Sequence, residues 1–232
     1  MKPTDRIFTA LDTTDIDHAV SLARNLTGHV GGAKVGKEFF TANGPDGVRR
    51  VSDTGMPVFI DLKWHDIPNT VAGAVRASLP LKPAIVNVHA AGGAAMLHAA
   101  AGAAAEAGDD RPLVLAVTVL TSLDDDDLHA IGVDTDVTTQ VVRLARLSQD
   151  NGIDGVVCSA REIEALREAC GPEFKLLVPG IRPTWAAIGD QKRVMTPKEA
   201  IAKGADYLVI GRPITGADDP VAAAERIADE LD

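Results

Sequence analysis

Two lysines and two aspartates stand near the ends of two neighbouring apolar segments. Asp61 and Lys63 end the segment 57–63, Lys34 lies in the segment before it, and Asp66 follows three residues after Lys63. Positions i and i+2 of a strand point to the same side, so Asp61 and Lys63 should share one environment. Opposite charges arranged as a set can be buried together, whereas one unpaired charge cannot. The spacing predicts either a charged active site or a structural salt bridge between two strands.

A second group of residues has the chemistry to hold a phosphate. Gly211 and Arg212 follow the last apolar segment, and Arg182 and Gln191 follow the segment before it. Glycine allows the backbone to approach a ligand closely, and the arginine fork matches phosphate oxygens. The alternative interpretation is an exposed arginine beside a turn.

These residues depend for their positions on short apolar segments that alternate with helical stretches along the whole chain. Near-continuous apolar runs are typical of strands that are covered on both faces. Strands are expected at Ile7–Asp12, Ala33–Lys37, Pro57–Lys63, Ile85–Ala90, Leu113–Leu120, Gly155–Ser159, Lys175–Ile181 and Tyr207–Arg212. Helices are expected at Ile16–Leu26, Pro45–Thr54, Pro68–Leu79, Ala94–Ala107, Thr138–Asn151, Ala160–Cys170, Pro197–Lys203 and Pro220–Leu231.

Eight such units predict an α/β fold, a single (β/α)8 TIM barrel over residues 1–232, with a doubly wound open sheet as the alternative. Asp15, Thr196 and Asp219 are suited to cap helices, and the acidic run 124–127 should begin another one. In such a barrel the active site lies at the C-terminal ends of the strands, where the charged residues stand.

Composition excludes several classes of function. The net charge of −10 and the 3% aromatic content argue against a nucleic-acid-binding surface. No stretch is long and apolar enough to span a membrane, and the first residues do not resemble a signal peptide. Cys158 and Cys170 are expected to be free thiols in a reducing compartment, the cytoplasm. His65 and His89 are not part of a two-histidine-plus-carboxylate set, so no metal site is expected.

Several segments in sequence order resemble one family. Phe59-Ile-Asp-Leu-Lys-Trp-His-Asp-Ile-Pro-Asn-Thr70 resembles the Asp-x-Lys-x-x-Asp-Ile-x-x-Thr signature of the orotidine 5'-phosphate decarboxylases, in their compact bacterial form. The resemblance covers nearly the whole chain. It extends to Ala10-Leu-Asp12, Lys34, Asn87-Val-His-Ala90, Val119-Leu-Thr-Ser122, Val178-Pro-Gly-Ile-Arg-Pro183, Gly189-Asp-Gln-Lys-Arg193, Met195-Thr-Pro197 and Val209-Ile-Gly-Arg-Pro213.

The resemblance implies a carboxy-lyase that needs no cofactor and converts orotidine 5'-monophosphate to UMP and CO2, the last step of de novo pyrimidine nucleotide biosynthesis. Lys63 would donate a proton to C6 of the pyrimidine, Asp61 would lie against the departing carboxylate, and Lys34 would complete the charged row.

The other site residues also take their roles from the resemblance. Asp66, with Ile67 and Thr70, would reach the neighbouring subunit's site in a homodimer with shared active sites. Asp12 would bind the ribose, and Thr121, with Ser122, would lie near the base. The phosphate would be held by Arg182, Gln191, Gly211 and Arg212.

Three other functions remain open at this stage. A metal-dependent sugar-phosphate decarboxylase or aldolase on a related barrel would use a similar Asp-x-Lys pair together with further acidic metal ligands. A Schiff-base aldolase would need Lys63 as a neutral amine, which two nearby carboxylates oppose. A nucleotide-binding module without activity would keep the barrel and the phosphate site.

Overall fold

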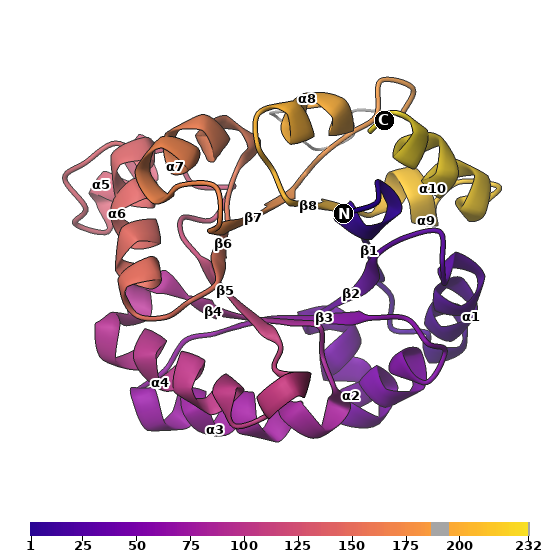
Figure 1. Cartoon of the computed structure of the whole chain (residues 1–232), viewed down its shortest axis with the longest axis horizontal. Helices are drawn as coiled ribbons and strands as arrows, with labels where there is room; N and C mark the ends of the chain where they lie inside the picture. The colour runs from indigo at the N-terminus through magenta and orange to yellow at the C-terminus, as the bar shows by residue number, and fades with distance from the viewer. Residues whose placement is uncertain (187–194, 232) are drawn as a thin grey trace.

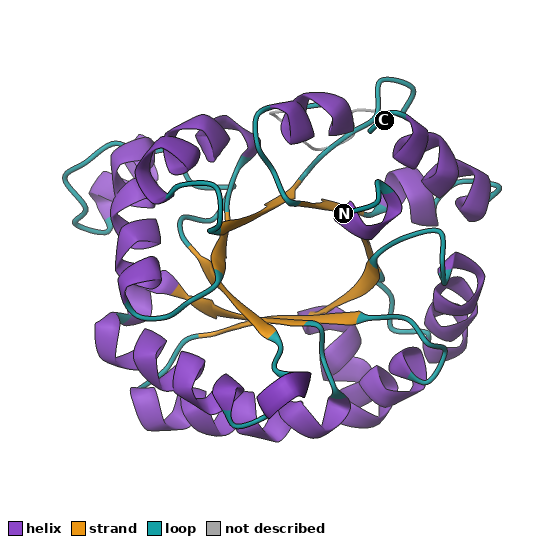
Figure 2. Ribbon diagram, viewed as in Figure 1, coloured by secondary structure: helices purple, strands orange, loops and turns teal. Residues whose placement is uncertain are grey.

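Eight parallel strands form a closed barrel in which each strand pairs with the next and β1 pairs with β8. The computed structural model describes residues 1–186 and 195–231. Figures 1 and 2 show the strands as a ring enclosed by the helices. The strands are β1 (Ile7–Ala10), β2 (Gly32–Gly36), β3 (Val58–Trp64), β4 (Ile85–His89), β5 (Leu113–Val117), β6 (Gly155–Val157), β7 (Lys175–Pro179) and β8 (Tyr207–Ile210).

The pairing of β1 with β8 confirms the predicted (β/α)8 barrel, and the doubly wound alternative is wrong. The helices are α1 (Ile16–Leu26), α2 (Lys37–Ser52), α3 (Pro68–Ser78), α4 (Ala94–Ala105), α5 (Asp125–Ala130), α6 (Val137–Asp150), α7 (Ile163–Cys170), α8 (Pro197–Ala202), α9 (Arg212–Thr215) and α10 (Pro220–Asp229). Among the described residues, no helix has the length and apolar character needed to cross a bilayer.

Side-chain caps fix where several helices begin. The Asp15 carboxylate accepts the backbone N–H groups of Asp17 and His18, both at 3.0 Å, at the start of α1. Thr196 and Asp219 cap α8 and α10 in the same way, and Asp124 caps α5. These contacts satisfy N–H groups that lack a partner within the helix, and they confirm the predicted helix starts.

A small apolar cluster fills the barrel on the N-terminal side of the charged residues. The Phe8 ring meets the rings of Phe59 and Tyr207 edge-on, at centroid distances of 6.3 and 5.6 Å. Phe59 precedes Asp61 by two positions on β3, so it points to the same side one layer deeper. The charged residues therefore lie on an apolar floor.

Several predicted boundaries differ from the structure, and β1, β5, β6 and β7 each end two or three residues earlier than expected. The range of α2 contains two helical stretches separated by the non-helical Gly44, whose φ is 59°. The second stretch begins at Pro45 as expected, whereas the first, from Lys37, was not predicted. The last strand ends at Ile210, so Arg212 is the first residue of the short helix α9. Pro213 lies in the first turn of α9, where its fixed φ suits a helix, and this favours a helix start over a continued strand.

Candidate active site

Four charged side chains form a continuous row at the C-terminal ends of β1, β2 and β3. Lys34 Nζ lies 3.2 Å from Asp12 Oδ1 and 3.4 Å from Asp61 Oδ2. Lys63 Nζ lies 2.5 Å from the other oxygen of the same carboxylate, Asp61 Oδ1. The two lysines therefore hold Asp61 from both sides, in the order Asp12–Lys34–Asp61–Lys63.

The charged residues at the centre of this row are buried, so they interact strongly with one another. The Lys34 and Asp61 residues are each only 8% exposed, whereas the Asp12 side chain is 61% exposed. Burial by itself raises the pKa of Asp61, but the charges of Lys34 and Lys63 outweigh it. Hydrogen bonds from Lys63 and Asn87 add to this effect, and the pKa of Asp61 lies below its ordinary value. Asp61 is therefore a fixed anion at neutral pH.

Asn87 holds the Asp61–Lys63 pair in place. Its amide nitrogen donates to Asp61 Oδ1 at 2.7 Å, and its amide oxygen accepts the backbone N–H of Lys63 at 2.8 Å. Lys63 has a φ of 54°, in the left-handed region, and the pairing of β3 with β4 shifts register between Ile60 and Trp64. Such a conformation costs free energy in a non-glycine residue and persists only where the surroundings enforce it.

Asn87 is not among the site residues expected from the sequence. The available signal was a polar amide inside the apolar strand Ile85–His89, because a buried amide needs hydrogen-bond partners.

Two histidines lie beside the row. The rings of His65 and His89 are 5.4 Å apart between centroids. Burial, followed by the charges of His65, Lys37 and Lys63, lowers the pKa of His89 to about 4, with Asp61 acting in the opposite direction. At neutral pH His89 is therefore an uncharged side chain beside several cations.

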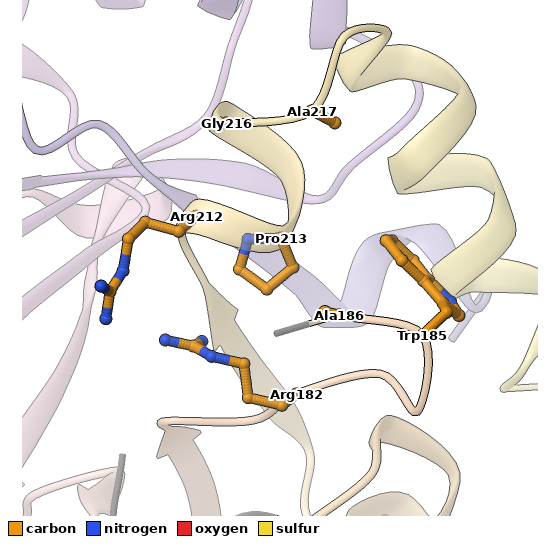
Figure 3. Close-up of a pocket in the computed structure, with 7 residues that line it drawn as sticks. All are labelled: Arg182, Trp185, Ala186, Arg212, Pro213, Gly216 and Ala217. Atoms are coloured by element: carbon orange, nitrogen blue, oxygen red, sulfur yellow. The ribbon is translucent and has the colours of Figure 1, made fainter. Parts of the chain in front are cut away.

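Two residues of the second predicted group line a pocket of about 310 Å³ between the loop after β7 and the start of α9. Arg182 and Arg212 line it together with Trp185, Ala186, Pro213, Gly216 and Ala217. Figure 3 shows the guanidinium groups of Arg182 and Arg212 directed toward the same space. The residue Arg182 is only 6% exposed, and Gly211 immediately precedes α9. Gln191, also predicted here, lies outside the described residues.

Other predicted residues lie apart from the charged row within one chain. The Asp66 residue is exposed, its Oδ1 accepts the backbone N–H of Ile67 at 2.6 Å, and no ion pair between these described residues joins it to Lys63. Ile67 is 67% exposed, and Thr70 and Thr121 are also exposed. Asp66 and Ile67 border an open depression of about 520 Å³, whose other lining residues are His65, Pro68, Ala91 and Gly92.

In the part of the chain that the structure describes, no three His, Cys, Asp or Glu side chains are grouped so that they could hold a metal ion. The row consists instead of alternating acids and lysines. The alternation brings opposite charges together in pairs and leaves Lys63 at one end of the row.

Comparison with known proteins places this chain in a family. The model of the orotidine 5'-phosphate decarboxylase / HUMPS family matches residues 5–227. The chain belongs to this family. The resemblance found in the signature segment 59–70 is thereby confirmed over nearly the whole chain.

Individual members of the decarboxylase family align with this chain over nearly their full length. The orotidine 5'-phosphate decarboxylase of Paramagnetospirillum magneticum is 56% identical over 229 residues, covering 97% of this chain and 97% of the relative. That of Rhodospirillum rubrum is 58% identical over 230 residues, covering 97% and 93%. The crystal structure of orotidine 5'-phosphate decarboxylase from Lactobacillus acidophilus superposes with a TM-score of 0.87 at 36% identity, covering 97% of this chain and 98% of that one.

Proposed function

We propose that this chain converts orotidine 5'-monophosphate to UMP and CO2 without a cofactor. The observation that carries the proposal is the row in which Lys63 is held against Asp61, at the end of β3 and above an apolar floor. The names of relatives that share half or more of its residues support the same reaction.

The reaction needs a fixed cation beside the reacting carbon. When the bond from C6 to the carboxylate breaks, its electron pair stays on C6, and CO2 leaves. The Lys63 ammonium stabilises that developing negative charge and then transfers its proton to C6, which gives UMP. The ion pair of Lys63 with the Asp61 carboxylate also opposes Schiff-base chemistry, which needs an unpaired amine as the nucleophile.

The polar residues around the row have complementary roles. Asp61 faces the leaving carboxylate. Lys34 balances the charge of Asp61 from the far side, so one buried anion is shared by two cations. We assign Asp12 to the ribose hydroxyls, since its exposed carboxylate keeps acceptor sites beyond the contact with Lys34. Thr121 is assigned to the base.

The phosphate is assigned to the pocket of Arg182 and Arg212, with Gly211 and Gln191 as further contacts. Two guanidinium groups directed into one space form a local cationic site on a chain whose net charge is −10. Charge-assisted, bidentate hydrogen bonds are the strongest that a phosphate can receive from side chains. Phosphate binding remote from C6 can orient the base and so increase the rate as well as the affinity.

We further propose a homodimer in which Asp66, Ile67 and Thr70 of one chain complete the site of its partner. Support comes from the exposure of Ile67 beside an open depression, since large exposed apolar side chains favour contact with another surface. A cytoplasmic location is proposed as well, which the free, buried thiols of Cys158 and Cys170 support.

The test is to follow the loss of orotate absorbance when orotidine 5'-monophosphate is added to EDTA-treated protein. The Lys63→Ala variant is the control, and its fold is checked by circular dichroism. Turnover that needs Lys63 and survives EDTA is expected. Turnover that EDTA abolishes and a divalent metal restores would contradict the cofactor-free reaction. Folded protein without turnover of this substrate, but with metal-dependent turnover of a sugar phosphate, would instead indicate the sugar-phosphate enzymes. Folded protein that binds UMP but leaves the substrate unchanged would indicate a binding module.

A further inference from the structure

The loop that carries Arg182 is attached to the last helix of the barrel. Trp185 follows Arg182 by three residues and lines the same pocket. The Trp185 indole N–H donates to Glu230 Oε1 at 2.9 Å, and the Arg226 guanidinium lies 4.6 Å from the centroid of the Trp185 ring. In Figure 3, Trp185 lies at the side of the pocket away from the two guanidinium groups.

The two contacts together fix the orientation of the Trp185 indole as well as its position. Arg226 lies on α10 and Glu230 directly follows it, so the two residues are one turn apart and lie on one side of the helix. The cation packs over the ring and fixes its plane, and the carboxylate accepts the N–H and fixes its rotation within that plane. An apolar contact alone would leave both less defined.

The contacts of Trp185 connect the segments that carry the two pocket arginines to the same helix, α10. Arg212 begins α9, and α9 packs against α10 and β1. Through Trp185, the loop that carries Arg182 is tied to that same α10. Both guanidinium groups are therefore positioned by contacts with α10, although Arg182 and Arg212 follow different strands.

We propose that Trp185, Arg226 and Glu230 form a positioning group that sets the separation of Arg182 and Arg212 for a phosphate monoester. The inference rests on the proposed function, because it assigns the phosphate of the substrate to this pocket. None of the three residues needs to touch the reacting carbon. Their effect is to hold the pocket in its binding geometry before the substrate arrives.

The decisive measurement compares a substrate with and without phosphate. The Trp185→Phe variant keeps an aromatic ring for Arg226 but loses the N–H donor, and Arg226→Met removes the cation while keeping a long side chain. We expect kcat/KM for orotidine 5'-monophosphate to fall about tenfold or more in each, since small displacements of binding groups have effects of that size. The kcat/KM for orotidine should change less than about twofold, because orotidine does not use the pocket.

The matched control is Glu225→Gln, on the same helix, which alters the 2.9 Å contact of Glu225 with His29. It should leave both substrates unaffected. Equal losses for both substrates in Trp185→Phe, or no loss for the phosphorylated one, would overturn the proposal, since a purely structural role predicts the former.

Calorimetric binding of UMP and uridine provides a readout that needs no turnover. Weaker UMP binding with unchanged uridine binding in Trp185→Phe is expected. Suppose that Trp185→Phe binds UMP more weakly than the wild type and binds uridine equally well, but the wild type does not turn over orotidine 5'-monophosphate. The proposed function is then wrong, and the positioning group is supported. If UMP binds the wild type and Trp185→Phe equally, the positioning group is wrong, whatever the activity.

Discussion

Asn87 and Lys63 are joined through the main chain of Lys63, whose N–H is donated to the Asn87 side-chain oxygen at 2.8 Å. The nitrogen of the same amide donates to Asp61 at 2.7 Å. One buried side chain therefore fixes both the left-handed backbone of Lys63 and the carboxylate that its ammonium contacts.

Removing this amide should slow catalysis without unfolding the barrel. In Asn87→Ala we expect kcat to fall roughly 10- to 100-fold, as for other losses of alignment at a reacting centre. The hydrogen bond from Asn87 lowers the pKa of Asp61, so its loss raises that pKa. The acid limb of the kcat profile should therefore move to higher pH. Measured profiles from pH 4 to 8 with an unmoved acid limb would contradict this role.

Arg212→Ala should weaken the phosphate pocket selectively. A charge-assisted hydrogen bond contributes about 1.5–3 kcal/mol, so kcat/KM for orotidine 5'-monophosphate should fall about 10- to 150-fold. Orotidine should react at an unchanged rate. Arg49→Ala is the control, since Arg49 is an exposed residue of α2 paired with Asp46. A similar loss for orotidine would show that Arg212 acts on the fold rather than on the phosphate.

Shared sites can be tested by mixing two inactive proteins. Lys63→Ala and Asp66→Ala protomers should each be nearly inactive alone. After subunit exchange, each heterodimer of a two-fold symmetric pair would contain one site with both residues intact, restoring roughly a quarter of wild-type activity at equal mixing. Exchange is verified with differently tagged protomers. Verified heterodimers without activity would exclude sharing between Lys63 and Asp66.

His89 should make the fold sensitive to acid. Its pKa is about 4 in the folded chain and about 6.5 in an unfolded one. Between these values the unfolded chain binds a proton that the folded chain does not, so stability falls as the pH falls from 6.5 to 4.

The effect should be roughly 1–2 kcal/mol after allowance for partial solvent exposure. Urea unfolding at pH 7 and pH 4.5 should show a smaller pH effect in His89→Gln than in wild type. His98→Gln, which changes an exposed histidine of α4, should behave like wild type. An identical pH effect in all three proteins would show that His89 does not cause the loss of stability at acid pH.

A partly buried cation at the opposite end of the barrel, Arg167, should affect stability alone. Arg167 donates to the carbonyl groups of Gly204 and Phe174 and pairs with Asp206 at 2.5 Å. Arg167→Ala leaves Asp206 partly buried without this partner, and we expect unfolding to become easier by about 3 kcal/mol. The kcat of the folded fraction should not change, because Gly204 and Asp206 precede β8, away from the site. A reduced kcat in fully folded protein would argue against this separation.

The fold and the central pair could be predicted because each depends on local patterns. Eight apolar segments in alternation with capped helices led to the barrel, and the spacing of Asp61 and Lys63 led to their contact. The contact itself does not arise from regular alternation alone, since Lys63 lies at a register shift with a φ of 54°. A pattern of side-chain types carries no information about that distortion.

Long-range partners could not be predicted in this way. Asn87 meets Asp61 from a different strand, and Trp185 meets Arg226 and Glu230 from the far end of the chain. Such contacts are decided by how the elements pack in three dimensions. The periodicity and capping residues of one segment are local properties and do not specify which distant segment packs against it.

The pairing of β1 with β8 has a consequence for synthesis of the chain on the ribosome. Strand β1 is translated first, and its second neighbour is translated about 200 residues later, at an elongation rate of roughly 5–20 residues per second. For that interval β1 exposes one edge of unpaired N–H and C=O groups, which is the kind of edge that recruits other chains. A ribosome stalled before Tyr207 would hold a chain that has its Asp12, Lys34, Asp61 and Lys63 but cannot close around them, so aggregation of arrested chains should depend on β1.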